Sequence, residues 1–209
     1  MQFDVQDQTT KITDIEILSQ KDREPNANPG VALGLSATMS NQVLSMFDGF
    51  LRGTCYAKAQ GGAPKQDSIE GVEQVTDMPA LTAIGEALGQ FGWHGELTGY
   101  TLVLDYGMGG AANIELADCK LSGFKLQCRE GGTVVVKFKL EAPDVAETVF
   151  GKLSKLKSQD VKITLSPPVV KQQHLDDAPA PIKAAKTKPA ADTPEAALRR
   201  AHANEGAPA

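Results

Sequence analysis

The sequence predicts an α+β fold rich in antiparallel strands, in the order β-β-α, then several strands, then β-α-β. Short stretches in which apolar and polar residues alternate recur along the chain, and this pattern is typical of half-buried strands. Few segments place apolar residues at helical spacing. The 20 glycines fall mostly at turn-like positions, which favours many short strands over long helices.

Residues 1–168 are expected to form one domain, and residues 169–209 a disordered tail. A folded body of about 165 residues buries roughly 70% of its unfolded surface, so it needs no metal or disulfide for stability. The tail is rich in alanine and proline, with too few large apolar side chains to offset the entropy of ordering. Residues 193–203 begin with Thr-Pro-Glu, a good helix start, and could form a short helix that binds a partner.

The first part of the chain predicts two strands. Residues 12–18 form the first, with Ile15 and Ile17 on one face. Residues 31–39 form the second, because apolar residues alternate there with small or polar ones.

A short helix and a long polar loop are expected next. Ser40 occupies an N-cap position, and apolar residues that include Phe47 and Phe50 follow at helical spacing. The pattern predicts an amphipathic helix that ends near residues 52–53. Residues 58–78 are polar throughout and form a long loop, a type of segment that often carries function or lacks order.

Strand patterns return after an ambiguous segment. Residues 79–90 have some helical spacing, which two glycines interrupt. Phe91 and Trp93 then share one face of a strand. Residues 98–99 are expected to be a turn, and the alternating residues 100–106 the partner of that strand.

A second group of strands is predicted between residues 107 and 140. The glycine-rich residues 107–110 form a turn into a strand that begins at Ile114. The apolar phase of this strand shifts at residues 122–123, which requires a bulge or a tight turn. A further turn at residues 130–132 leads into a strand over residues 134–140, which has apolar residues on one face and lysines on the other.

The domain is expected to end with a helix and a strand. Asp144 and Glu147 have the spacing of a carboxylate capping box. The apolar residues among 145–156 then lie on one side of a helix. Residues 161–165 form the last strand, which the prolines at 167–168 end.

No arrangement of residues predicts catalysis, a cofactor or a metal site. His94 is expected to be a surface histidine; a zinc site formed by His94, Cys119 and Cys128 is an alternative, but its spacing matches no familiar zinc pattern. Both cysteines are better explained as small buried hydrophobic residues. Three acidic residues near residues 107–110 could form a carboxylate cluster, although acidic residues are common at strand ends: Asp105, Glu115 and Asp118. The glycine runs lack the spacing of phosphate-binding loops, and we predict that the protein is not an enzyme.

The N-terminus and the cysteines indicate a cytoplasmic protein. The first ten residues have neither the basic nor the apolar region of a signal peptide, and no apolar run approaches the roughly 20 residues of a membrane span. The three cysteines show no Cys-x-x-Cys spacing, which is compatible with reduced thiols.

Charge is unevenly distributed along this acidic chain, whose net charge is −5. Residues 1–119 carry a net charge of −10, and residues 120–165 a net charge of +4. Within the basic part, six lysines on a strand, the following helix and the last strand could gather on one side of the protein: Lys137, Lys139, Lys152, Lys155, Lys157 and Lys162. Lysines with few aromatic neighbours would contact phosphates without reading bases; the alternative is a solvated face that favours solubility.

The sequence from residue 100 to residue 168 resembles a family of proteins from tailed phages and prophages. The resemblance rests on the segments DYGMGG, NIELADCK and EGGTV, and on the ending GKL…ITLSPP. Genes for such proteins often lie beside replication and recombination genes. The resemblance implies a role there, but it transfers no catalytic residue. In outline, the β-α-β ending with lysines on its helix is also similar to a repeat of a sliding clamp.

The leading hypothesis is therefore a non-enzymatic phage accessory protein of DNA replication or recombination. It would act by contact with the DNA backbone or by docking a phage or host recombination or replication protein, and it could form a homo-oligomer. One alternative is a structural or assembly protein of the phage. The other is an inhibitor of a host defence protein, in which the acidic part of the chain would mimic nucleic acid.

Overall fold

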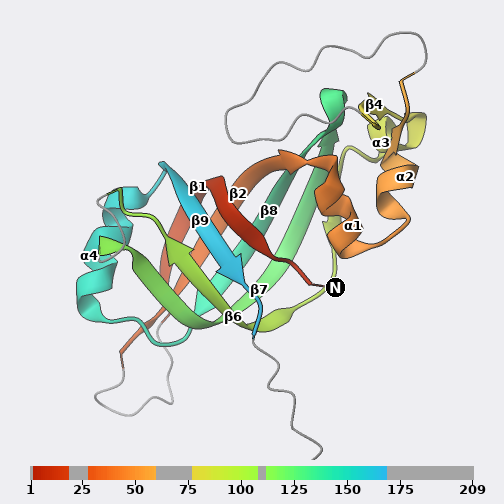
Figure 1. Ribbon diagram of the computed structural model, residues 1–209. Coiled ribbons are helices and arrows are strands. Elements are labelled where there is room, and N and C mark those ends of the chain that lie inside the picture. Colours follow the sequence, from red (N-terminus) through yellow and green to blue (C-terminus); the bar gives the residue numbers. More distant parts are fainter. Residues whose placement is uncertain (1, 19–27, 60–76, 108–111, 169–209) are drawn as a thin grey trace, which may run out of the picture. The chain divides into compact units, whose positions relative to one another are not determined.

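Antiparallel strands make up most of the chain that the computed structural model describes, which is residues 2–18, 28–59, 77–107 and 112–168 (Figure 1). These residues belong to one unit, Met1–Val169. The predicted β-rich α+β class is confirmed. Most of the predicted loop 58–78, part of the glycine turn 107–110, and the predicted tail with its helix at 193–203 lie outside the described residues.

The elements follow one another along the chain as strands, short helices and 3₁₀ turns. The strands are β1 (Val5–Leu18), β2 (Gly30–Ser40), β3 (Tyr56–Ala57), β4 (Ala80–Leu81), β5 (Gln90–Trp93), β6 (Leu97–Leu104), β7 (Ile114–Arg129), β8 (Thr133–Ala142) and β9 (Asp160–Ser166). The α-helices are α1 (Leu44–Phe47), α2 (Leu51–Cys55), α3 (Ala83–Leu88) and α4 (Glu147–Leu156), with 3₁₀ turns at Asn41–Val43 and Glu130–Gly132.

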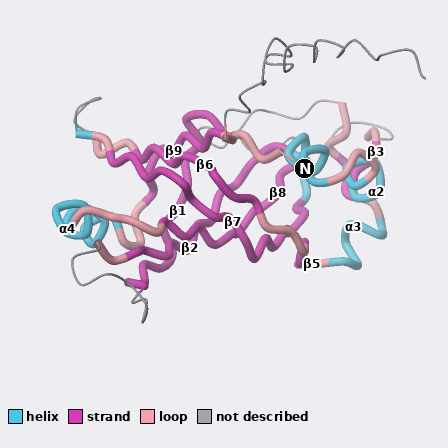
Figure 2. The backbone as a smooth tube through the Cα atoms, turned by 90° about the horizontal axis from the view of Figure 1, so that it is seen from below, coloured by secondary structure: helices cyan, strands magenta, loops and turns pink. Residues whose placement is uncertain are grey.

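The main sheet closes on itself. Its strand order is β5-β7-β6-β9-β1-β2-β8, and β7 pairs with β8 as well, so that β6, β9, β1, β2, β8 and β7 form a ring of antiparallel neighbours. We call this ring the closed sheet. Helix α4 lies at one end of it, and α1, α2 and α3 lie at the other end (Figures 1 and 2). β5 adds to the edge of β7 beyond β6.

A bulge in the long strand β7 allows this closure. The first half of β7 pairs with β6, and its second half pairs with β5 on one edge and β8 on the other. The register against β8 shifts between Ser122 and Lys125, and Gly123 between them has a φ of +63°. The bulge predicted at residues 122–123 is therefore confirmed.

The interior of the closed sheet is filled by apolar side chains, with a cluster of aromatic rings towards the α1 end. Phe3 is fully buried, and its ring centroid lies 5.7, 5.6 and 5.4 Å from those of Phe47, Phe124 and Phe138. Edge-to-face contacts of this kind stabilise a core by about 0.5–1.5 kcal/mol beyond burial of the same area. The residues before β1 are therefore part of the core, which the sequence pattern did not indicate.

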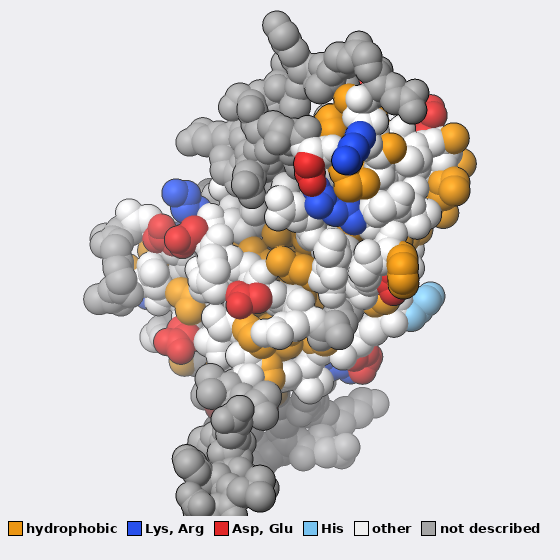
Figure 3. All heavy atoms as spheres, turned by 45° about the vertical axis from the view of Figure 1, so that its right-hand side comes forward, with side chains coloured by type: hydrophobic (Ala, Val, Ile, Leu, Met, Phe, Trp, Pro, Cys, Tyr) orange, Lys and Arg blue, Asp and Glu red, His pale blue; other side chains and the backbone are white. Residues whose placement is uncertain are grey.

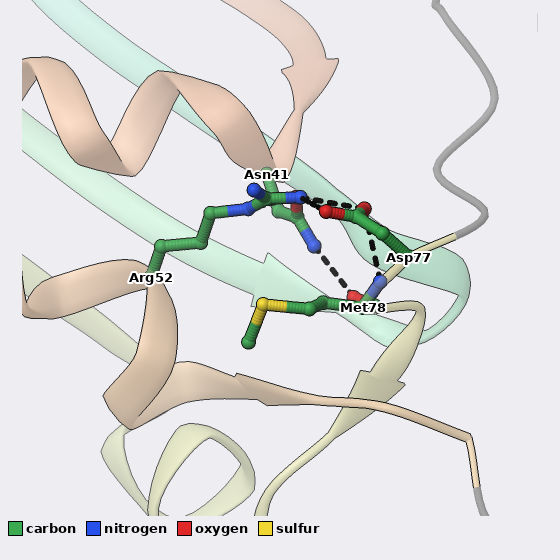
Figure 4. Close-up of polar contacts among 4 residues, drawn as sticks. All are labelled: Asn41, Arg52, Asp77 and Met78. Atoms are coloured by element: carbon green, nitrogen blue, oxygen red, sulfur yellow. Dashed lines mark hydrogen bonds and ion pairs between the residues drawn. The ribbon is translucent and has the colours of Figure 1, made fainter.

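A polar network fastens the helical end of the sheet (Figure 4). Asn41 is fully buried; its Nδ2 donates to the carbonyl oxygen of Met78 at 2.7 Å, and its Oδ1 accepts from Nε of Arg52 at 2.9 Å. The guanidinium of Arg52 also donates to both carboxylate oxygens of Asp77, at 2.7 and 2.9 Å. This network ties α2 to the segment before β4 and satisfies a buried amide that would otherwise cost about 1–3 kcal/mol.

The prediction of a single helix after Ser40 is wrong, because the chain turns between α1 and α2. Asp48 Oδ1 accepts a hydrogen bond from the backbone N–H of Phe50 at 2.8 Å, a local turn that competes with helix. Phe50 is consequently 86% exposed instead of lying on a buried helical face. Ser40 does stand at the N-cap position, but its side chain makes no capping hydrogen bond.

The predicted pairing of residues 91–93 with residues 100–106 is also wrong. Residues 98–99 lie inside β6, where Gly99 has a φ of +77° at a register shift, and they do not form a turn. β5 and β6 both pair with β7, one beyond the other, because β7 is long enough to serve both. The other correction to a strand concerns β1, which begins earlier than predicted and leaves Ile17 66% exposed.

The predicted capping box at α4 does not form. The N-cap residue is Ala146, and Asp144 instead accepts a hydrogen bond from Nδ2 of Asn28 at 2.9 Å. The apolar side of the predicted helix is nevertheless seen, since Leu153 and Leu156 are buried. β9 follows as predicted; between it and β8 in the sheet lie β1 and β2.

Replacement of Gly85 by alanine should destabilise the protein. An added Cβ would lie 2.5 Å from the carbonyl oxygen of Cys55, so α2 and α3 would have to separate. We expect a loss of about 1–3 kcal/mol in the free energy of unfolding, measured by urea denaturation. Gly53→Ala is the matched control, because an added Cβ there meets no atom within 4 Å. An equal loss in both variants would contradict the close approach.

Gly123→Ala should weaken the closure of the sheet. Its φ of +63° is unfavourable for any residue with a Cβ, and we expect a loss of about 1–2 kcal/mol. Thermal unfolding would measure the loss, with Gly151→Ala in α4 as the control, because an added Cβ there also meets no atom within 4 Å. If Gly123→Ala were as stable as the unchanged protein, the bulge would not constrain the fold.

Candidate nucleic-acid interface

Strand register brings three lysines into line on the outer face of the closed sheet. Lys11 of β1 lies opposite Ser36 of β2, Ser36 lies opposite Lys137 of β8, and Lys137 lies opposite Lys125 of β7. All three lysines are exposed. We call Lys11, Lys137 and Lys125, with Ser36 between the first two, the basic row.

Lys125 and Lys137 are directly opposed like charges. Residues facing one another across antiparallel strands have their Cα atoms about 4.5–5.5 Å apart, and like charges in such pairs destabilise a sheet. Neither lysine makes an ion pair with any residue that the structure describes. The pair is therefore an uncompensated positive site in a protein whose net charge is negative.

A groove of about 340 Å³ runs beside the basic row. Small residues of β2 form its floor, and longer charged side chains of β1, β7 and β8 form its walls. The lining includes Ala32, Gly34, Asp14, Glu16, Lys125, Lys137 and Lys139. At Gly34 an added Cβ would lie 2.7 Å from Oγ1 of Thr13, so the side chain of Thr13 would have to move to admit a larger residue on this floor.

The acidic wall of the groove is already paired with lysines. Nζ of Lys139 lies 3.1 Å from a carboxylate oxygen of Glu141 and 3.9 Å from one of Glu16. Nζ of Lys157 lies 3.1 Å from Oδ1 of Asp14, and this hydrogen bond lowers the pKa of the Asp14 carboxyl. The unpaired charge of the groove is therefore the positive charge of Lys125 and Lys137.

The structure does not bring the six sequence-predicted lysines together. Lys137 belongs to the basic row, whereas Lys139 and Lys157 are in ion pairs. Lys152 turns towards the protein: its Nζ lies 3.4 Å from the carbonyl oxygen of Ala112 and 5.7 Å from the centre of the Tyr106 ring.

The other two predicted lysines lie elsewhere on the surface. Lys155 is exposed on α4, and Lys162 is exposed on β9, three strands from β8. An expectation based on sequence proximity thus placed residues together that the sheet order separates.

Lys11 and Lys125 were missed by the sequence analysis, for different reasons. The turn at residues 130–132 joins β7 to β8 and sets Arg129 opposite Thr133. Counting four residues back along β7 and four residues forward along β8 then sets Lys125 opposite Lys137. That signal was present in the sequence. Lys11 could not be found this way, because β1 pairs with β2 across a register shift between Ile12 and Asp14.

The other candidate groups do not assemble. His94 is exposed just after β5. Within the described ranges, no three residues of the metal-binding types His, Cys, Asp and Glu lie close enough together to hold an ion. Asp105 is engaged locally, since its Oδ1 accepts from the backbone N–H of Gly107 at 2.8 Å.

All three cysteines are buried and free of disulfides. Burial raises the pKa of Cys119 to about 12, and burial together with the neighbouring Cys55 raises that of Cys128 to about 12. Cys119 donates a weak hydrogen bond to the carbonyl oxygen of Leu116 at 3.3 Å. Cys119 and Cys128 are therefore small buried residues, as the sequence analysis expected.

Burial of Cys119 should make the protein less stable at alkaline pH. Because the folded pKa is about 12, the folded state keeps this proton, whereas an unfolded thiol loses it near pH 8.5. The contribution of this proton to the free energy of unfolding is fully present below about pH 8.5, and it is lost as the pH rises towards 12. When the pH rises from about 8 to about 10, the free energy of unfolding should fall in both proteins, and in the Cys119→Ala variant it should fall by roughly 1–2 kcal/mol less than in the unchanged protein. Urea denaturation under reducing conditions measures this; identical pH dependence in both proteins would contradict it.

Comparison with known proteins does not assign the chain to a family. No family model, no curated protein and no solved structure matches the chain. Within the described part of the chain, none of the helices has the length and hydropathy that crossing a membrane requires. Any account of function must therefore start from the residues of the surface itself.

Proposed function

We propose that the protein is a non-enzymatic phage accessory protein of DNA replication or recombination, which acts in the bacterial cytoplasm by contact with the DNA backbone. The observation that carries this proposal is the pair of opposed lysines, Lys125 and Lys137, without an ion-pair partner among the described residues. A bound backbone phosphate, with its single negative charge, would lie between the two ammonium groups and reduce their repulsion.

The chemistry of the row favours backbone contact over base recognition. Lysine ammonium groups pair with phosphates whatever the base sequence. The positions that face one another along the row are occupied by lysines and Ser36, so no aromatic ring in the row offers a stacking surface for bases. We expect weak binding that depends strongly on salt, because the rest of the acidic protein repels a polyanion.

Loss of the two opposed lysines should weaken DNA binding, reduce its dependence on salt and stabilise the fold. Fluorescence anisotropy with labelled oligonucleotides at low and moderate salt measures the first effect. In the Lys125→Gln, Lys137→Gln double variant, each lost phosphate contact should reduce the salt slope by about 0.7–0.9. Removal of the like-charge pair should raise the free energy of unfolding by roughly 0.2–1 kcal/mol.

The matched control removes the same charge from elsewhere on the surface, by Lys155→Gln with Lys162→Gln. These residues are exposed and lie outside the basic row and its groove. We expect the control to keep most of the salt-sensitive binding. Absence of binding by the unchanged protein, or an equal loss in both double variants, would refute the proposed contact.

A role in phage assembly is the second candidate, and one observation favours it. Among the described strands, β5 pairs only with β7. Large apolar side chains of α1, α3 and the turn after α1 are exposed at the same end: Met46, Phe50, Ile84 and Leu88. Figure 3, which turns this end forward, shows hydrophobic side chains at its surface. Light scattering separates the candidates: rings or tubes favour assembly, and a small discrete particle favours the accessory role.

A further inference from the structure

The basic row runs across the strands and not along them. Its members come from four neighbouring strands, in the order β1, β2, β8 and β7. With neighbouring strands about 4.8 Å apart, Lys11 lies about 10 Å from Lys137, and the whole row is about 15 Å long. A chain of phosphates that touches all three lysines must therefore cross the sheet.

This path is curved, because the four strands belong to the closed sheet. Outward side chains on successive strands of a closed sheet diverge, so Lys11 and Lys125 point in different directions from the surface. Duplex DNA is stiff, with a persistence length of about 150 base pairs, and would touch such a surface at one end of the row only. A single strand bends freely and can reach both ends.

Ion pairs between carboxylates and lysines border the row on the side of α4. Asp14 and Lys139 stand one outward position further along the strands, and Glu16 and Glu141 stand two positions further. Asp14 is paired with Lys157, and Glu16 and Glu141 are paired with Lys139. Outward positions are about 6.6–6.8 Å apart on a strand, and the minor and major grooves of a duplex are about 6 and 12 Å wide. The second backbone of a duplex would therefore lie over lysines whose charge these carboxylates already neutralise.

The opposite border offers a second backbone no compensating charge. The next row of facing residues lies one outward position nearer to the end with α1, α2 and α3. It consists of Thr38, Val135 and Gln127. All three are uncharged. Among the described residues, only one line of phosphates thus finds lysines that are free of carboxylate partners. The half-buried Ser36 and the low floor of β2 leave room for this line between the strands on either side.

We infer that the basic row is a site for single-stranded DNA and that Asp14 and Glu16 act against the binding of a duplex, because they hold Lys157 and Lys139 in ion pairs. The inference rests on the proposed function, because it specifies which form of DNA the same site binds. Lys125 and Lys137 hold one phosphate between them, Lys11 holds a phosphate further along the strand, and the Ser36 hydroxyl donates to the backbone between them.

The test compares the full-length protein's affinity for labelled oligothymidine and for a duplex of equal length, by anisotropy at one low salt concentration. We expect the single strand to bind about tenfold tighter or more, since the duplex would have to bend or give up one end of the row. The double variant Asp14→Asn, Glu16→Gln should bind the duplex more strongly, with a smaller gain for the single strand. The ratio of single-strand affinity to duplex affinity should therefore fall. Glu86→Gln with Glu115→Gln, exposed carboxylates outside the groove, is the matched control and should leave the ratio unchanged.

The outcomes separate this inference from the proposed function. If neither DNA form binds, the proposed function fails and the inference with it. If both forms bind with equal affinity, or the duplex binds more tightly, DNA contact stands and strand selection is overturned. An unchanged ratio in the Asp14→Asn, Glu16→Gln variant also overturns it, provided that circular dichroism shows that the variant is folded.

Discussion

The structure depends on the ability of one strand, β7, to pair with three others. Its bulge at Gly123 lets the strand pass from the edge of β6 to that of β5 while it continues along β8, and this last pairing closes the sheet. Closure fixes which residues face the interior on every strand. It places the aromatic cluster around Phe3 inside, and it brings Lys125 opposite Lys137 outside. Core and candidate site thus follow from the same pairing.

Strands with one buried and one exposed face were predictable from sequence, and their partners mostly were not. β9 alternates throughout, and β2 and β8 alternate after their first three residues, because one face meets the core and the other is more exposed. The same alternation carries no information on which strand lies alongside. The β6–β9 pairing is an example, and β5 was assigned the wrong neighbour for this reason. Only the β7–β8 pairing was indicated by a local feature of the sequence, the turn at residues 130–132. The same turn could have shown that Lys125 lies opposite Lys137.

Local polar chemistry accounts for the errors in the helices and for part of the error in the site. Asp48 forms a turn with Phe50 and ends α1, although apolar residues continue at helical spacing. Asp144 bonds to Asn28 from a distant loop, so it does not cap α4. Lys139 and Lys157 likewise have carboxylate partners on β1 that no pattern within their own segment indicates. Lys125 and Lys137 differ from these two lysines in that they lack such partners in the described part of the protein and face one another across the sheet, and both properties belong to the folded sheet alone.

The pairing of β1 with β9 has a consequence for the order in which the chain can fold during synthesis. Val5 faces Leu165, so the first strand made receives one of its two neighbours only when the last strand leaves the ribosome. Until then β1 and β6 each keep an edge with unpaired backbone groups, and such edges attract other strands. The ring that shields these edges in the folded protein cannot form gradually. Its completion waits for β9, and association with other nascent chains is the competing process throughout that interval.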